Sequence, residues 1–213
     1  MLPRETPLPA PIRLSRQRRV LTDLARIFST IFNPFLTALA LFIILAHASA
    51  NDAPTFWYLA FGSTLFTSFG PMLYVLWLYA TDRIADLDMS VRSEREAVFG
   101  AFVVFYLLGT AALWFAHAPR LLIATMGGYA IASLIVQYIT RYWKISTHAL
   151  GISASLASLF YVFKQQPLPF MILVPLVCWA RVYLKAHTFG QVVGGAVLGT
   201  VCVYLAYHYF HLI

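Results

Sequence analysis

Seven apolar segments, most of them long enough to cross a lipid bilayer, follow one another along this chain with few charges inside them. A membrane-spanning helix needs roughly 20 consecutive apolar residues. The fifth segment is short, and Pro34 can kink the first, so six full spans with one re-entrant or tilted piece is the alternative. The segments are residues 25–47, 54–80, 98–117, 121–140, 148–163, 168–186 and 190–210. We therefore predict an all-α, polytopic transmembrane helical bundle of six to seven spans.

The composition leaves no room for a sizeable soluble domain. Of the 213 residues, 61% are hydrophobic and 11% are charged, whereas a soluble domain carries about 25% charged residues. We expect residues 1–24, which are rich in proline and arginine, to form a basic tail at the membrane surface, and residues 25–213 to form one transmembrane domain. Cys178 and Cys202 lie within apolar segments, where a thiol behaves as a small hydrophobe. We expect neither a disulfide framework nor a zinc site.

The cations are unevenly distributed between the two sides of the predicted bundle. The tail and the loops around residues 81–97, 141–147 and 187–190 fall on one side, because an even number of spans separates each from the next. That side holds nearly all of the lysines and arginines. Cytoplasmic loops are enriched in these residues, so we expect the N-terminus and the active face in the cytoplasm, with the opposite orientation as the alternative. The net charge of +7 favours anionic head groups or phosphorylated ligands over nucleic acid.

Ionisable residues near helix mouths form an ordered pattern in the second half of the chain. The pattern consists of Lys144, Ser146, Thr147 and His148, followed by Arg181, His187 and Gln191. His187 and Gln191 are four residues apart and share one helix face. The amide oxygen of Gln191 can accept a hydrogen bond from the Nδ1–H of His187, which leaves Nε2 free to attack.

The same pattern supplies groups that bind phosphate. Arg181 can hold two phosphate oxygens at once, and Lys144 acts as a point charge. The backbone N–H groups around Ser146 and Thr147 would form an anion site at the start of a helix. Beyond them, Gly195 and Gly199 have the four-residue spacing that predicts close helix packing.

A charged stretch between residues 82 and 96 adds two further cations. Arg92 and Arg95 are three residues apart and point to the same side of a helix. They would complete a phosphate cage on the face that carries the histidines. In the alternative interpretation, they pair with the acidic residues of their own stretch and have no role in function. Those acidic residues are Asp88, Glu94 and Glu96.

These residues resemble the motifs of the type 2 phosphatidic acid phosphatase family of membrane lipid phosphatases, over about residues 82–200. Residues 145–148, Ile-Ser-Thr-His, stand in the place of the family's Pro-Ser-Gly-His. Ala180, Arg181, His187 and Gln191 stand in the place of its Ser-Arg, five residues, His, three residues, Asp.

The resemblance implies a role for each matched residue. His187 would be the nucleophile that becomes phosphorylated, and His148 the general acid. The phosphoryl group would be held by Arg181, Lys144, Ser146 and Thr147. By position alone, Arg92 and Arg95 would serve in place of the family's first motif. Gln191 replaces an aspartate and can fix the tautomer of His187, but it cannot stabilise the imidazolium.

The resulting hypothesis is an integral-membrane lipid phosphatase that needs no metal or other cofactor and works through a phosphohistidine. Its partners would be membrane lipids and a substrate such as a phosphatidate-like lipid or a polyprenyl phosphate or diphosphate. One alternative is a magnesium-dependent prenyl-diphosphate enzyme that uses Asp82 and Asp86, four residues apart on a helix. The other is a degenerate member that binds a phospholipid head group without turnover.

Overall fold

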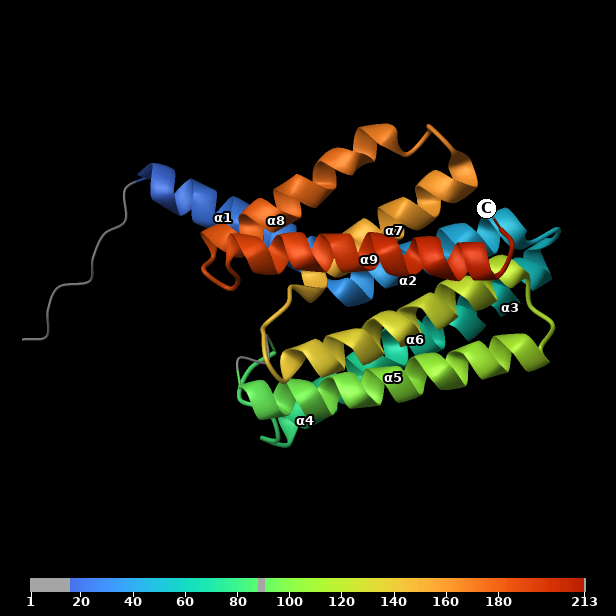
Figure 1. The fold of residues 1–213 in the computed structure, drawn as a ribbon, viewed down its shortest axis with the longest axis horizontal. Coiled ribbons are helices and arrows are strands. Elements are labelled where there is room, and N and C mark those ends of the chain that lie inside the picture. Colours follow the sequence, from blue (N-terminus) through green and yellow to red (C-terminus); the bar gives the residue numbers. More distant parts are fainter. Residues whose placement is uncertain (1–15, 88–90, 213) are drawn as a thin grey trace, which may run out of the picture.

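The computed structural model describes residues 16–87 and 91–212, and the regular elements in these two ranges are all helical (Figure 1). This confirms the predicted all-α fold. In chain order the elements are α1 (Arg16–Ile31), α2 (Pro34–Ser49), α3 (Ala53–Thr64), the π-helix η1 (Leu65–Phe69), α4 (Gly70–Ala80), α5 (Arg92–Phe115), α6 (Arg120–Thr140), α7 (Thr147–Phe163), the 3₁₀-helix η2 (Leu168–Ile172), α8 (Leu173–Tyr183) and α9 (Phe189–Tyr209).

The helices run back and forth between two ends of the molecule. In Figure 1, α1 and the connections α4–α5, α6–α7 and α8–α9 lie at the left end. The connections α2–α3, α5–α6 and α7–α8 lie at the right end, together with the C-terminus. This is the grouping of connections that the sequence predicted, and it brings the histidine and arginine motifs to one end of the bundle.

Fewer helices are long and apolar enough to be full membrane spans than the six to seven spans that the sequence predicted. Four spans in the described residues are long and apolar enough, or five if α1 and α2 are one bent span. The four are Ala53–Ala80, Ser93–Phe115, Arg120–Thr140 and Phe189–Tyr209. The two other apolar helices, Thr147–Phe163 and Leu168–Tyr183, are shorter. The predicted count is slightly higher than this because it included these two shorter helices, and a span needs roughly 20 residues.

The first span is bent by 49° between α1 and α2, as the Asn33-Pro34 pair predicted. Asn33 begins α2 by accepting hydrogen bonds from the backbone N–H groups of Phe35 (3.0 Å) and Leu36 (2.9 Å). Its Nδ2 donates to the carbonyl of Thr30 at the end of α1 (2.9 Å). Of the predicted tail, residues 1–15 lie outside the described ranges. From Arg16 onwards the chain is helical, and α1 packs along α8.

Helices α7 and α9 approach one another backbone to backbone. A Cβ atom on Gly195 would collide with the carbonyl oxygen of Ser146, and one on Gly199 would collide with the carbonyl oxygen of Leu150. Only glycine permits such an approach without moving a helix. The close packing predicted from the glycine spacing is therefore confirmed, and its partner is the start of α7.

Candidate active site

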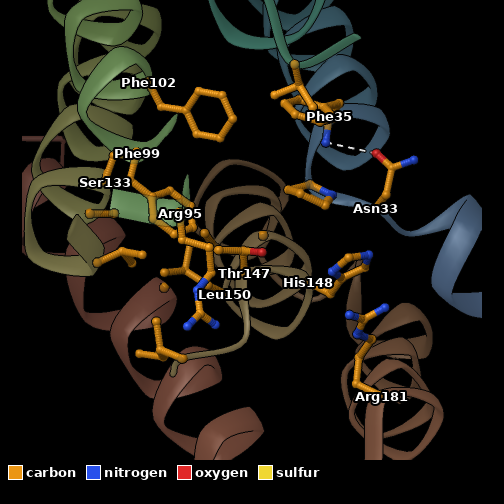
Figure 2. Close-up of a pocket in the computed structure, with 18 of the residues that line it drawn as sticks. Asn33, Phe35, Arg95, Phe99, Phe102, Ser133, Thr147, His148, Leu150 and Arg181 are labelled. Atoms are coloured by element: carbon orange, nitrogen blue, oxygen red, sulfur yellow. Dashed lines mark hydrogen bonds between the residues drawn. The ribbon is translucent and has the colours of Figure 1, made fainter. Parts of the chain in front are cut away.

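A cavity of about 910 Å³ lies between helices α4, α5 and α6 on one side and helices α1, α2, α7, α8 and α9 on the other. Its lining contains six of the nine residues that the sequence singled out, namely Arg95, Lys144, Thr147, His148, Arg181 and His187. Figure 2 shows the imidazole of His148 above the guanidinium of Arg181, with Arg95 reaching in from α5. Motifs from the two halves of the chain thus face a common space.

The imidazole of His187 is oriented by Gln191. Nδ1 of His187 lies 3.2 Å from Oε1 of Gln191, which also accepts a hydrogen bond from the backbone N–H of Thr188 (3.1 Å). Because a backbone N–H can only donate, the amide oxygen and not the amide nitrogen faces both groups. Nδ1 of His187 must then carry a proton, so in the neutral imidazole Nε2 keeps its lone pair. The contact predicted from the four-residue spacing is present.

Gln191 has a second task that sequence reasoning missed. The hydroxyl of Thr188 accepts from the backbone N–H of Gln191 (3.4 Å), so the two residues form a capping box at the start of α9. The signal was in the sequence, since threonine followed three residues later by glutamine is a helix-start pattern. The amide that orients His187 is therefore itself fixed by the backbone.

The five residues between Arg181 and His187 form a tight return from α8 to α9. The carbonyl of Arg181 accepts from the backbone N–H groups of Ala186 (3.1 Å) and His187 (3.2 Å). Lys185, in the left-handed conformation with φ 56°, turns the chain. The Arg-to-His spacing thus fixes the backbone of His187 relative to that of Arg181.

The segment that carries Lys144 and His148 is attached to α9. The backbone N–H of Ser146 donates to the carbonyl of Gln191 (3.2 Å). Ser146 is fully buried, and its hydroxyl caps α7 by accepting from the backbone N–H of Ala149 (3.4 Å). Thr147 and His148 occupy the first turn of α7, where the helix dipole favours an anion. The phosphate-binding role of Ser146 itself stays a prediction.

Arg181 is 4% exposed and lies in the last turn of α8. Its Nη1 donates to the hydroxyl of Ser29 on α1 over 2.7 Å, and Ser29 is 8% exposed. A buried guanidinium needs such partners because an unsatisfied charged donor is costly. Sequence reasoning missed Ser29. Its only signal was its place beside Ala25 on the small-residue side of α1, which indicates helix contact and not a partner.

We predict that Ser29→Ala weakens phosphate binding. The guanidinium of Arg181 loses the hydrogen bond from Nη1 to this hydroxyl, and hydrogen bonds to charged groups contribute about 1.5–3 kcal/mol. We expect KM for a lipid phosphate to rise roughly tenfold or more, with a smaller change in kcat, and Ser29→Thr to restore KM. The control is Thr22→Ala, whose hydroxyl bonds only locally to the carbonyl of Arg18 (2.7 Å). Equal KM values for Ser29→Ala and wild type would contradict this positioning role.

The first half of the chain contributes Arg95 to the lining of the cavity. Arg92 begins α5, but its side chain lies outside what the structure describes, as does Asp88. Two acidic residues of this stretch, Glu94 and Glu96, have the following partners. Oε1 of Glu96 pairs with Nε of Arg141 over 2.7 Å, and Oε2 of Glu94 accepts from the backbone N–H of Ala85 (3.1 Å). The exposed pair adds little stability, but it joins the start of α5 to the loop that carries Lys144.

The geometry assumed for a magnesium site was wrong. Asp82 and Asp86 lie in the turn segment between α4 and α5 and not on a helix, and Asp82 has a φ of 54°. The helical spacing therefore does not apply to them, because the chain leaves the helix at Thr81 once the apolar run ends. Asp86 lines the cavity, but the described residues contain no group of three or more His, Cys, Asp or Glu side chains placed to hold a metal ion.

Together these features define a multi-pass helical membrane protein with a cavity whose histidines and cations suit it to phosphate chemistry. Residues 136–213 match the family model of the PAP2 superfamily, which confirms over that range the predicted resemblance to the type 2 phosphatidic acid phosphatases. The match indicates phosphatase activity on phosphate esters. No curated protein and no solved structure matches the chain.

The match covers the segments that carry Lys144, His148, Arg181, His187 and Gln191. The match begins at residue 136, whereas the resemblance noted in the sequence begins at about residue 82. Helices α1 to α5, which supply Ser29 and Arg95, precede it. The family match therefore gives no information on the part of the cavity wall that these helices form, and that part is described from the structure alone.

Proposed function

We propose that this protein is an integral-membrane lipid phosphatase that cleaves a phosphomonoester or diphosphate through a phosphohistidine on His187. The observation that carries the proposal is the contact of His187 Nδ1 with Gln191 Oε1. It leaves Nε2 as a nucleophile in a cavity that His148, Lys144 and Arg181 also line. A nucleophile, an acid and two cations are the groups that metal-free phosphoryl transfer requires.

The reaction proceeds in two steps. Nε2 of His187 attacks phosphorus, the bond from phosphorus to the lipid oxygen breaks, and protonated His148 gives its proton to that oxygen. Water then attacks the phosphohistidine, neutral His148 takes the proton of the water, and the bond between nitrogen and phosphorus breaks to release inorganic phosphate. Arg181 and Lys144 neutralise the phosphoryl oxygens throughout.

A lipid substrate is supported by the other lining residues of the cavity. Beyond His148, the lining is mainly apolar and includes Phe35, Phe99 and Phe102 (Figure 2). A water-soluble phosphate ester would leave this surface without a partner, whereas a hydrocarbon tail would cover it. The cation end and the apolar end thus match the two parts of a lipid phosphate.

A phosphate-release screen tests the proposal. The purified protein is given phosphatidate, phosphatidylglycerophosphate, and polyprenyl monophosphate and diphosphate, each with and without EDTA. We expect release from at least one of these lipids and no effect of the chelator. Loss of release with EDTA and recovery with Mg²⁺ would contradict the metal-independent mechanism.

Gln191 supports a second candidate, a member that binds a lipid phosphate head group without turnover. The neutral amide lacks the negative charge that would stabilise the imidazolium of His187 during attack. This candidate predicts saturable binding of lipid phosphates in the same screen with no phosphate release from any of them.

We also propose that the end of the bundle with the histidines faces the cytoplasm, because most of the cations lie there. A cysteine introduced at residue 5 or at residue 90, in a background without Cys178 and Cys202, should react with a membrane-impermeant maleimide only after the cytoplasmic side is opened. A cysteine introduced in place of Asn51, between α2 and α3, serves as the opposite control. Labelling of residues 5 and 90 in sealed, right-side-out vesicles would reverse the orientation.

A further inference from the structure

The cavity continues from the phosphate-binding end into the interior of the bundle. Along α5 its lining runs from Arg95 through Phe99 and Phe102 to Tyr106. Tyr106 follows Arg95 by eleven residues, which is about 16 Å along an α-helix. This length is close to half of the roughly 30 Å hydrocarbon thickness of a bilayer. We call this part of the cavity, from Phe99 to Tyr106, the apolar arm. With Arg95 at the membrane surface, the arm ends near the middle of the bilayer.

The walls of the arm come from both groups of helices. The rings of Phe35 on α2 and Phe102 on α5 meet edge to face at 5.7 Å, and Figure 2 shows them near one another above the charged residues. Tyr129 on α6 turns its hydroxyl to Ser155 on α7 (3.4 Å). The hydroxyl of Tyr129 is thereby hydrogen-bonded within the wall, and its ring is available for apolar contact.

The inner end of the arm is closed. The lining residues at that end are buried, namely Tyr106, Gly128, Ala154, Gly199, Cys202 and Val203. The next layer is a tightly packed group that includes Ala124, Ala206 and Tyr207, each at most 6% exposed. The hydroxyl groups of Tyr207 and Thr125 are hydrogen-bonded there (2.9 Å). A chain that enters from the charged end therefore cannot pass through.

The outer end of the cavity is open. The exposed members of the lining include Thr30 on α1 and Leu76 and Tyr79 on α4. A lipid can reach the cavity between these two helices, at the depth where the cations lie. A head group at that depth would contact Arg181, and its tail would be directed inward.

We propose that the apolar arm is a dead-end channel that encloses the hydrocarbon tail of the substrate and sets an upper limit on the tail length that contributes to binding. The proposal rests on the proposed function, and it adds that the substrate tail lies inside the bundle and not in the surrounding bilayer. For a substrate that is dissolved in water as a monomer, each methylene that enters the channel should raise kcat/KM roughly fourfold, which is the effect of moving one CH₂ group from water into an apolar site. Methylenes beyond the closed end should add nothing or reduce kcat/KM.

A series of alkyl phosphates from hexyl to octadecyl tests the channel. Ala132 lines the arm and is 5% exposed, so Ala132→Phe places a ring inside it. The neighbouring Ile131 is 53% exposed on the outside of α6, and Ile131→Phe is the matched control. We expect the wild type and Ile131→Phe to share one limiting chain length. In Ala132→Phe the limit should move to shorter chains, with a loss of about tenfold or more for longer chains and no change for hexyl phosphate.

A second readout separates failure of the channel from failure of the proposed function. Binding of alkylphosphonates of the same lengths, measured by calorimetry with wild-type protein and both variants, needs no turnover. A length limit in binding without any phosphate release would keep the channel and overturn the phosphatase. Phosphate release with identical length profiles in Ala132→Phe and Ile131→Phe would overturn the channel. Ala154→Leu, on the α7 wall, replaces Ala132→Phe if that variant does not fold.

Discussion

His187→Ala should abolish phosphate release from every lipid phosphate that the wild-type protein cleaves. In the proposed mechanism Nε2 of His187 forms the covalent bond to phosphorus. Removal of a catalytic nucleophile costs several orders of magnitude in kcat, so we expect a loss of at least about 10⁴-fold. The measurement is the rate of inorganic phosphate release at saturating substrate. Retained turnover would contradict the phosphohistidine mechanism.

The covalent intermediate gives this experiment an independent readout. Rapid quenching of wild-type protein with a substrate labelled at phosphorus should trap a phosphoryl group that is stable to base and labile to acid. The His187→Ala protein should trap none. His208→Ala is the matched control, because His208 stacks on Tyr204 near the end of α9 and lies outside the cavity lining. It should release phosphate and trap label as the wild type does.

The parts of the site that follow from local sequence could be predicted. The four-residue interval from His187 to Gln191 gives one helix face whatever the surrounding fold. The grouping of the connections at two ends followed from the order of the apolar segments. The first feature depends on helix geometry over a few residues and the second on the number of passes between connections, and the structure shows both.

The parts that depend on packing between distant segments could not be predicted. Ser29 reaches Arg181 only because α1 bends at Asn33 and packs along α8. Nothing in residues 16–31 specifies that partner. The closed arm of the cavity likewise is lined by α5, α6, α7 and α9, whose lining residues are far apart in the sequence. The proposed magnesium site failed for the converse reason, since a helical spacing was assumed for a segment that forms a turn.

Gly195→Ala should reduce activity about a hundredfold and lower the stability of the bundle. The added Cβ atom would collide with the carbonyl oxygen of Ser146, and a backbone atom cannot rotate away as a side chain can. Helix α9 would have to move from the start of α7, which shifts His148 relative to His187. A misplacement of about 1 Å can cost about 10² in rate. Overpacking typically costs about 1–3 kcal/mol in the free energy of unfolding.

A matched glycine separates this collision from the general effect of alanine in a helix. Gly62 on α3 has nothing within 4 Å of an added Cβ, and alanine is favoured over glycine in a helix interior by about 1 kcal/mol. Gly62→Ala should therefore be at least as stable as the wild type and keep its activity. Thermal unfolding in detergent and phosphate release are measured for both variants. If Gly195→Ala is as stable and as active as Gly62→Ala, the close approach of α7 and α9 does not hold the two histidines in place. The two glycines were chosen because an added Cβ collides with a backbone oxygen at one and not at the other.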